Sequence, residues 1–279
     1  LYRHIGQFTD TPAGDIGVGG REVAYMFGQY KKIVDRFEGG VITGKGLTFG
    51  GSLARTEATG FGVCYFANEV LKNIGHDSFE GKKVVVSGSG NVAQFCAKKC
   101  TEMGATVIAM SDSAGYIYDP NGVNLDVLFD IKQKRRARIK VYADEVPGSE
   151  YHEGCKNIWN TVCDIAIPCA SQNEMDEEGA KTLIKNGAIA VFEGANMPLT
   201  PGAIAAVQEA NLRSPAASGP SLWHIAMSAA PLAIAGIRSP VSGPCTMAWI
   251  CLLPREHRSM PAAVASLPSR LTTTPLATT

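Results

Sequence analysis

Short apolar runs and segments of helical period alternate along residues 48–211. The apolar runs are rich in β-branched residues and end in glycine or other small residues, as in "KKVVVSGSG" (82–90), which is typical of buried strands. The segments between them have helical spacing and glycine near their ends, as in "NVAQFCAKKCTEMG" (91–104). This alternation predicts βαβ units, and therefore a doubly wound α/β fold with a parallel sheet. The other predicted strands are 106–112, 163–170 and 188–195, and the other predicted helices are 124–136 and 176–186.

The pattern changes after residue 211. Residues 212–279 contain no lysine, no aspartate and one glutamate, Glu256, whereas nine of the fifteen prolines lie there. A surface helix or strand needs charged or polar residues on its solvent face, and this stretch supplies few. Its apolar segment at 222–237 is interrupted by Pro231 and is shorter than the about 20 residues that cross a bilayer. We therefore expect residues 212–279 to be an atypical low-charge tail, not a native domain, and we expect no membrane partner.

Charge and cysteine usage narrow the classes of function. The 279 residues carry 26 basic and 26 acidic side chains, so the formal net charge is zero, and we expect no nucleic-acid partner. The eight cysteines form no C-x-x-C pair, which is typical of reduced thiols used as small hydrophobic residues; we predict no metal site and a cytoplasmic location. The first residues, "LYRHIGQFTD", have no initiator methionine and no signal-peptide core, so we expect the true N-terminus to lie upstream.

A dinucleotide fingerprint, Gly88-x-Gly90-x-x-Ala93, lies between the first predicted strand and its helix. Gly88 permits a tight turn, Gly90 allows the backbone to approach a pyrophosphate, and Ala93 allows close packing of the helix on the strand. The N-terminus of the helix offers amide donors to the anion. The second predicted strand ends at Asp112, about 20 residues further on, where such domains place an acid on the ribose 2′-hydroxyl. These features predict a Rossmann-type dinucleotide-binding domain over residues 48–211.

The choice between NADP and NAD depends on what surrounds Asp112. An acid there repels a 2′-phosphate, but the turn reads "SDS" (111–113) and a basic cluster follows it. Guanidinium and ammonium groups can neutralise a phosphate, which favours NADP over NAD. The alternative is a solvated basic helix end that complements the helix dipole. The cluster consists of Lys132, Lys134, Arg135, Arg136 and Arg138.

A second glycine-rich stretch, "TPAGDIGVGGRE" (11–22), lies near the start of the chain. So many glycines close together indicate that something approaches this backbone closely. The single carboxylate among them, Asp15, argues against a phosphate cradle. The pattern leaves two interpretations open, an acid–base carboxylate and a loop or N-cap aspartate. The glycines are Gly14, Gly17, Gly19 and Gly20.

Taken together, these motifs resemble hexameric glutamate dehydrogenases of the small-subunit type, and most closely their NADP-specific members. The resemblance covers about residues 1–211, and its motifs agree in order and spacing. It implies that residues 1–47 are part of a substrate-binding and oligomerisation domain, and that a full-length chain forms a homohexamer. The matching stretches are "YRHIG", "DTPAGDIGVGGREVAYMFGQYKK", "TGKGLTFGGSLARTEATGFG", "SGSGNVA", "IPCASQNE" and "FEGANMPLTPGA".

The resemblance also implies a reaction and roles for individual residues. The reaction is NADP-dependent oxidative deamination of L-glutamate to 2-oxoglutarate and ammonium, with the reverse reductive amination. Asp15 matches the acid that carries protons to and from the reacting nitrogen, and the Gly14 carbonyl matches a contact to the substrate amine. The cofactor contacts predicted from the residues and the resemblance together are Arg55, Thr59, Gly88, Ser89, Gly90, Asn91, Asp112, Ser113, Lys132, Arg135, Gln172, Asn173 and Asn196.

The sequence departs from the family pattern in two places. The family's catalytic lysine belongs to a glycine-rich motif upstream of the matched segments; Lys45 in "TGKGL" matches a different segment and is not assigned catalysis. After "QEAN" (208–211), a proline-rich stretch replaces the family's glycine-rich substrate segment, as a reading-frame shift would produce. We therefore expect this chain alone to be inactive. The alternatives are an NADP(H)-binding fragment without turnover and a related leucine or phenylalanine dehydrogenase.

Overall fold

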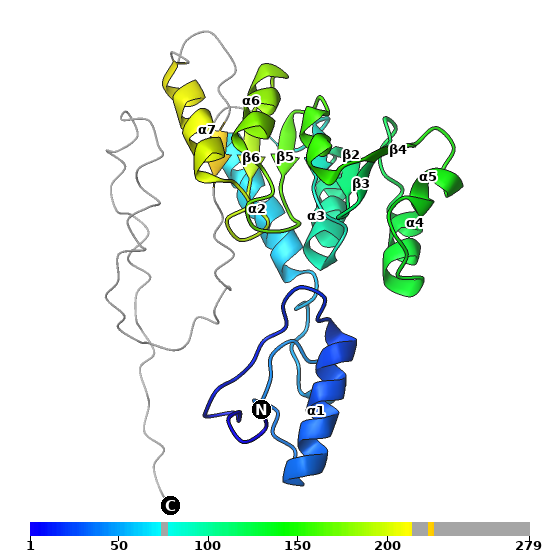
Figure 1. Ribbon diagram of the computed structural model, residues 1–279, viewed down its shortest axis with the longest axis vertical. Coiled ribbons are helices and arrows are strands. Elements are labelled where there is room, and N and C mark those ends of the chain that lie inside the picture. The colour runs from blue at the N-terminus through cyan, green and yellow to red at the C-terminus, as the bar shows by residue number, and fades with distance from the viewer. Residues whose placement is uncertain (74–77, 214–222, 226–279) are drawn as a thin grey trace, which may run out of the picture. The chain divides into compact units, whose positions relative to one another are not determined.

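The computed structural model describes residues 1–73, 78–213 and 223–225, all within one compact unit, Leu1–Pro231. The remainder of the predicted tail lies outside the described residues. The unit contains a seven-stranded sheet with the order β4-β3-β2-β1-β5-β6-β7 (Figure 1). The strands are β1 (Lys83–Val86), β2 (Thr106–Ser111), β3 (Gly115–Tyr118), β4 (Glu150–Glu153), β5 (Ile165–Ile167), β6 (Ala190–Phe192) and β7 (Trp223–Ile225).

The sheet is mixed, so the prediction of a parallel sheet is correct for only part of it. β1 pairs in parallel with β2 on one side and β5 on the other, and β6 and β7 continue the parallel order. β3 and β4 are antiparallel to their neighbours and were not predicted. They were missed because they lack the continuous apolar run of a buried strand: β3 alternates buried and half-buried residues, and β4 is an edge strand without a buried residue. The β2–β3 turn is held by hydrogen bonds from the Ala114 and Gly115 N–H groups to the Asp112 carboxylate.

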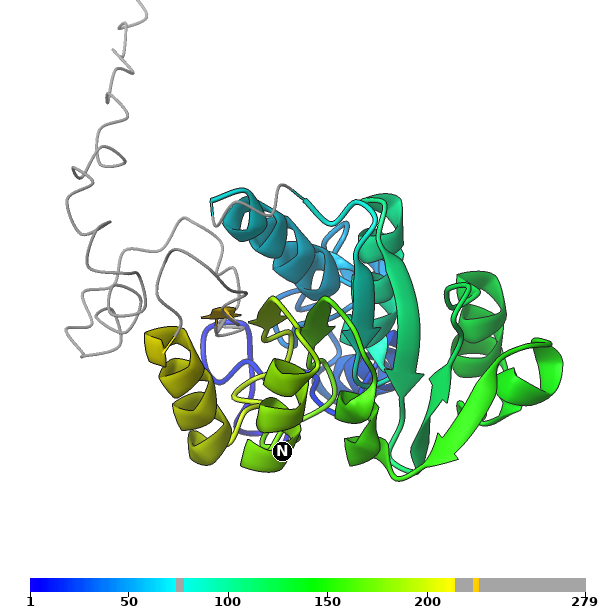
Figure 2. The same cartoon turned by 90° about the horizontal axis from the view of Figure 1, so that it is seen from above.

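Helices cover both faces of the sheet, which confirms the doubly wound arrangement (Figure 2). Alternate strand residues point to opposite faces, since Val84 and Val86 of β1 lie in one core and Val85 lies in the other. α2 and α3 pack against each other on the first face, and α6 and α7 do so on the second. The helices are α1 (Gly20–Val34), α2 (Ala58–Asn73), α3 (Asn91–Glu102), α4 (Leu125–Phe129), α5 (Val141–Glu145), α6 (Glu177–Lys185) and α7 (Pro201–Arg213), with 3₁₀ segments η1 (Leu47–Phe49) and η3 (Cys155–Asn160) and a π-helical turn η2 (Asp130–Lys134).

The predicted helices are present, with local differences at their ends. α6 begins after Asp176, whose carboxylate accepts the Gly179 N–H, and it ends before Gly187, whose φ of +84° lies in the left-handed region. The predicted helix 124–136 is shorter and less regular than expected. Its last turn is the π-helical η2, followed by Arg136 with a φ of +53°. This geometry allows the Lys132 ammonium to donate a hydrogen bond to the Ala137 carbonyl at 3.0 Å.

Residues 1–53 have a small core of their own. It consists of five buried residues, three on α1 and two in the following loop. The Phe27 ring lies at its centre and contacts the rings of Phe37 and Phe49, with centroids 5.2 and 5.6 Å away. The buried Lys45 side chain donates a hydrogen bond to the Ile42 carbonyl. The five residues are Val23, Phe27, Tyr30, Val41 and Ile42.

Candidate dinucleotide-binding site

The turn between β1 and α3 has the conformation that its glycines predict. Gly88 has a φ of +84°, and a Cβ at this position would lie 3.1 Å from the Ala170 Cα, so both its conformation and its surroundings require glycine. A Cβ at Gly90, by contrast, would have no neighbouring atom within 4 Å, so the turn leaves open space beside the start of α3. Ala93 is fully buried against the sheet. The backbone of this turn is therefore accessible to a ligand at the N-terminus of the twelve-residue helix α3.

Several hydrogen bonds hold this turn in place. The Gly88 N–H donates to the Ser111 hydroxyl of β2 at 2.8 Å, and the Gln94 side-chain amide donates to the Ser89 carbonyl at 2.8 Å. Asn91 donates from its side-chain amide to the Thr56 carbonyl, which links the start of α3 to the segment before α2. Of the residues predicted near the nicotinamide end, Thr59 is half-buried in the first turn of α2 and Arg55 is exposed just before it.

Two loops at the carboxyl ends of β5 and β6 meet at the same edge of the sheet. The Asn173 N–H donates to the Met197 carbonyl at 2.9 Å, and both residues have a left-handed backbone, with φ of +55° and +47°. Gln172, Asn173 and Asn196 are all exposed there. Since parallel β1, β5 and β6 end at this edge, the structure brings the predicted ribose contacts to the side where β1 leads into the glycine turn. Ligands of doubly wound sheets bind in this position.

Glu174 is a residue of this edge that the sequence reasoning did not select. Its carboxylate accepts hydrogen bonds from the Ala170 and Ser171 N–H groups at 3.0 and 3.3 Å, which closes the loop after β5. Burial raises the pKa of Glu174, although hydrogen bonds from Ser87 and from the two amides oppose the shift. The Ser87 hydroxyl also accepts the Cys169 N–H at 2.9 Å. The only feature of the sequence that could have indicated this role is the position of Glu174 directly after "SQN" (171–173). Its hydrogen-bond partners are set only when the loop folds.

The carboxylate of Asp112 is occupied by backbone groups. Its side chain is 6% exposed, and besides the two amides of the β2–β3 turn it accepts the Ile139 N–H at 3.0 Å. Burial opposes ionisation of the carboxyl, but the hydrogen bonds from Ala114, Ile139 and Gly115 outweigh it and lower the pKa of Asp112. The carboxylate thus fastens the 135–139 loop to the end of β2.

The basic cluster divides into groups with different partners. Arg135 lies between two carboxylates, 2.8 Å from Asp130 and 2.5 Å from Glu145, and the hydrogen bond to Glu145 is the main reason that its pKa is raised. Burial lowers the pKa of Lys132, whose ammonium is bonded to a carbonyl. Arg138 is exposed, donates to the Ser113 hydroxyl at 2.6 Å beside the end of β2, and lies 3.9 Å from the Asp112 carboxylate. Of the cluster, Arg138 is therefore the guanidinium that the structure brings to the β2 turn.

A family model described as Glutamate/Leucine/Phenylalanine/Valine dehydrogenase matches residues 50–219, which include the glycine turn and both loops. The chain belongs to this family. The match confirms the resemblance seen in the motifs. As a family member, the chain is similar to the NADP-specific glutamate dehydrogenase of Haemophilus influenzae, with 56% identity over 72% of this chain and 44% of that protein. It is 52% identical to the NAD-specific glutamate dehydrogenase of Bacteroides fragilis, over 73% of this chain and 46% of that protein.

Solved structures agree with this assignment to the dehydrogenase family. The crystal structure of Plasmodium falciparum glutamate dehydrogenase matches with a TM-score of 0.69 and 49% identity, over 75% of this chain and 45% of that chain. The chain thus spans less than half of the length of each of these relatives. Among its described residues, the helices are too short or too polar to cross a membrane.

The glycine-rich stretch around Asp15 is exposed to solvent. Asp15 and Gly14 are both exposed, and the Asp15 carbonyl accepts the Val18 N–H at 2.8 Å in a tight turn around Gly17, whose φ is +77°. A Cβ at Gly14 would lie 3.0 Å from the Val18 carbonyl oxygen, which gives a steric reason for glycine there. The turn places the Asp15 carboxylate outside the small core of residues 1–53.

Proposed function

We propose that this chain supplies the cofactor-binding part of a glutamate dehydrogenase that interconverts L-glutamate with 2-oxoglutarate and ammonium. The observation that carries the proposal is the glycine turn at the N-terminus of α3, joined at the carboxyl edge of the sheet by the exposed amides after β5 and β6. The similarity to glutamate dehydrogenases over this same part of the chain supports glutamate as the substrate class.

The site fits a nicotinamide dinucleotide. Open space at Gly90 next to the start of α3 suits a pyrophosphate, whereas at Gly88 the position of the missing Cβ is already crowded by protein. We assign the pyrophosphate to the backbone of Gly88, Ser89, Gly90 and Asn91, and the nicotinamide end to Arg55, Thr59, Gln172, Asn173 and Asn196. When bound, the nicotinamide supplies the hydride acceptor for oxidation of the substrate.

For the 2′-position of the ribose, we propose a phosphate held by Ser113 and Arg138, and therefore NADP rather than NAD. Arg138 is exposed, and its contact with the Ser113 hydroxyl gives a donor pair on the surface at the end of β2. Asp112 fixes the loop that carries Arg138 by accepting the Ile139 N–H, and its carboxylate lies 3.9 Å from the Arg138 guanidinium. The half-buried Lys132 is bonded to a carbonyl and Arg135 lies between two carboxylates, so we assign them supporting roles in the shape and charge of this loop.

For the chemistry, we propose Asp15 as the group that transfers protons to and from the substrate nitrogen, with the Gly14 carbonyl oriented to the amine. An exposed carboxylate in a glycine turn can be approached closely by a small substrate. Closure of a substrate domain over the nicotinamide would exclude water from this carboxylate. We propose a homohexamer of full-length chains as the active assembly.

Binding and turnover can be measured separately on this chain. We expect NADPH to quench or shift the protein fluorescence with a lower dissociation constant than NADH. Gly90→Val should abolish the binding of both, because its side chain fills the open space of the turn. Gly28→Val, at a glycine of α1 whose Cβ would likewise have no neighbouring atom within 4 Å, is the matched control. Binding that survives Gly90→Val would overturn the site assignment.

A second candidate is an NADP(H)-binding chain without turnover. It is favoured by the exposure of Asp15 in the structure. Glutamate-dependent NADPH formation by a full-length chain that contains this segment separates the two candidates, because only the first predicts turnover there. For the 279-residue chain alone we expect NADPH binding without turnover; turnover by it would establish the complete enzyme activity in this chain. A leucine or phenylalanine dehydrogenase is tested in the same assay with those amino acids.

A further inference from the structure

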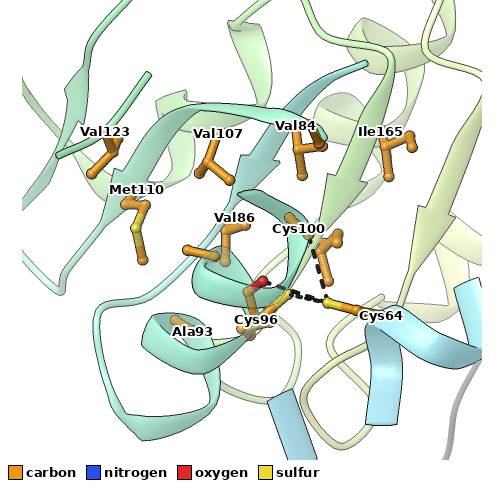
Figure 3. Close-up of a cluster of buried hydrophobic side chains, with 14 of the residues drawn as sticks. Cys64, Val84, Val86, Ala93, Cys96, Cys100, Val107, Met110, Val123 and Ile165 are labelled. Atoms are coloured by element: carbon orange, nitrogen blue, oxygen red, sulfur yellow. Dashed lines mark hydrogen bonds between the residues drawn. The ribbon is translucent and has the colours of Figure 1, made fainter. Parts of the chain in front are cut away.

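Three cysteine thiols come together between α2 and α3, outside the site described above (Figure 3). The Cys64 Sγ of α2 lies 3.6 Å from the Sγ of Cys96 and 3.6 Å from that of Cys100, both on α3. Cys96 and Cys100 are four residues apart and therefore lie on one helix face. All three sulfur atoms are within 4.8 Å of one another. Sulfurs bonded to one central atom at about 2.3 Å, as in zinc thiolate sites, lie about 3.8 Å apart, so the two separations of 3.6 Å from Cys64 suit sulfur bonds to one centre.

The surroundings of this three-cysteine cluster are apolar. All three residues are fully buried in the core that includes Val86 and Ile165 of the sheet (Figure 3). Hydrogen bonds with Cys64 and Cys96, together with burial, raise the pKa of the Cys100 thiol well above its usual range. Three thiolates around a divalent cation would leave a net negative charge in this core, at a high cost in desolvation. The cluster therefore suits a ligand that takes up three thiols and leaves no charge behind.

We propose that Cys64, Cys96 and Cys100 form a binding site for trivalent arsenic, supplied as arsenite. Neutral arsenous acid, As(OH)₃, reacts with three thiols to give As(SR)₃ and three water molecules. Three As–O bonds break and three As–S bonds form, and each thiol proton leaves with a hydroxyl group as water. Arsenic stays trivalent, so the step needs neither an oxidant nor a reductant. The product is uncharged and three-coordinate.

Access and competition also favour this ligand. Arsenous acid is small and uncharged at neutral pH, so it can enter when the contact between α2 and α3 opens transiently. A disulfide would need an external oxidant and would bring two sulfurs to about 2.05 Å from each other. Bonds from three sulfurs to one arsenic atom would leave the sulfurs closer to their present separation of 3.6 Å. Cys169 interacts with Cys96 through its thiol but does not belong to the group whose sulfurs are mutually within 4.8 Å.

The experiment incubates the reduced full chain with sodium arsenite, removes free arsenic by gel filtration and counts bound arsenic by mass spectrometry. We expect one arsenic per chain and a near-ultraviolet As–S absorption band. Cys64→Ala, Cys96→Ala and Cys100→Ala should each weaken binding by about 100-fold or more, since a tethered third ligand acts at high effective concentration. Cys163→Ala, a buried cysteine in the other core, is the matched control and should bind as the wild type does.

Arsenic X-ray absorption of the wild-type chain tests the same proposal without any substitution. We expect three sulfur neighbours at one distance and no oxygen neighbour. Oxygen ligands on the bound arsenic, or equal binding by Cys64→Ala and the wild type, would overturn the proposal. Retention of Zn²⁺ from zinc sulfate with the same cysteine dependence and higher affinity would also overturn it, because the argument requires a neutral complex.

Discussion

Residues 1–53 and the sheet domain that follows them bury apolar surface to very different extents. In the sheet domain, every residue of β5 and β6 is buried, and helices cover both faces. In residues 1–53 the core has five residues, while Phe8, Ile16 and Leu53 are 92%, 83% and 78% exposed. Large exposed apolar side chains concentrated in one segment are typical of surfaces that bind other protein surfaces. The sheet domain thus buries most of its apolar side chains within itself, whereas the N-terminal segment leaves several large ones exposed.

The largest effect that we expect concerns chemistry in the N-terminal segment. In a full-length enzyme, Asp15→Asn should lower kcat by about 10²–10⁴-fold because the amide cannot exchange the proton. The dissociation constant for NADPH should be unchanged, since the turn before α3 is untouched. Steady-state kinetics and fluorescence titration measure the two quantities. Asp10→Asn, an exposed aspartate in the same segment, is the control; a kcat for Asp15→Asn near that of the control would contradict the assignment.

Because the sheet domain has a large core and residues 1–53 have a small one, replacing a buried phenylalanine by alanine should affect stability differently in the two parts. Phe192→Ala removes a fully buried ring from β6 and should lower the free energy of unfolding of the sheet domain by about 3–5 kcal/mol. Phe27→Ala should instead open residues 1–53 locally and leave the sheet amides protected. Urea unfolding followed by circular dichroism and hydrogen exchange resolved by segment measure these effects. Equal loss of protection in β1 for both variants would show that the two parts unfold together.

Within the sheet domain, substitutions in the basic cluster should differ in their effect on the binding of NADPH and NADH. Arg138→Ala should weaken NADPH binding by about 10–100-fold, the range expected for a lost hydrogen bond to a charged group, and leave NADH binding unchanged. Arg135→Ala, whose guanidinium already has two carboxylate partners, is the matched control and should change the NADPH-to-NADH ratio little. Binding titrations of both cofactors give the ratio. An equal change for both cofactors in Arg138→Ala would contradict a 2′-phosphate contact.

The smallest effect concerns pH and Asp112. Because the folded-state pKa of this carboxyl is lowered, its stabilising contribution is present above the unfolded-state pKa and is lost as pH falls through the folded-state value. Asp112→Asn should cost about 1–2 kcal/mol at neutral pH, since one acceptor for backbone amides is replaced by a donor. The loss should shrink in acid. Urea unfolding at a series of pH values measures it, with exposed Asp144→Asn as the control; a pH-independent loss would exclude the ionised carboxylate as its cause.

Prediction from sequence was most accurate where structure depends on neighbouring residues. The strand, glycine turn and helix at 82–104 have the predicted order, and Gly88 has the left-handed backbone that its tight turn requires. The cysteines were predicted to be reduced thiols, and the six among the described residues are free; Cys245 and Cys251 lie outside them. The role of Asp112 was less accessible, because its third amide partner, Ile139, is 27 residues away in the chain.

The sequence by itself determined the alternation of elements, the site of the dinucleotide turn and the family, because periodicity, glycine positions and motif spacing are local properties. Only the tertiary structure decided the antiparallel β3 and β4, the division of the basic cluster and the meeting of Cys64 with Cys96 and Cys100. Each of these depends on pairing or packing between segments that are distant in the chain. Such contacts depend on the free energy of the whole folded core, and a local sequence pattern does not contain that information.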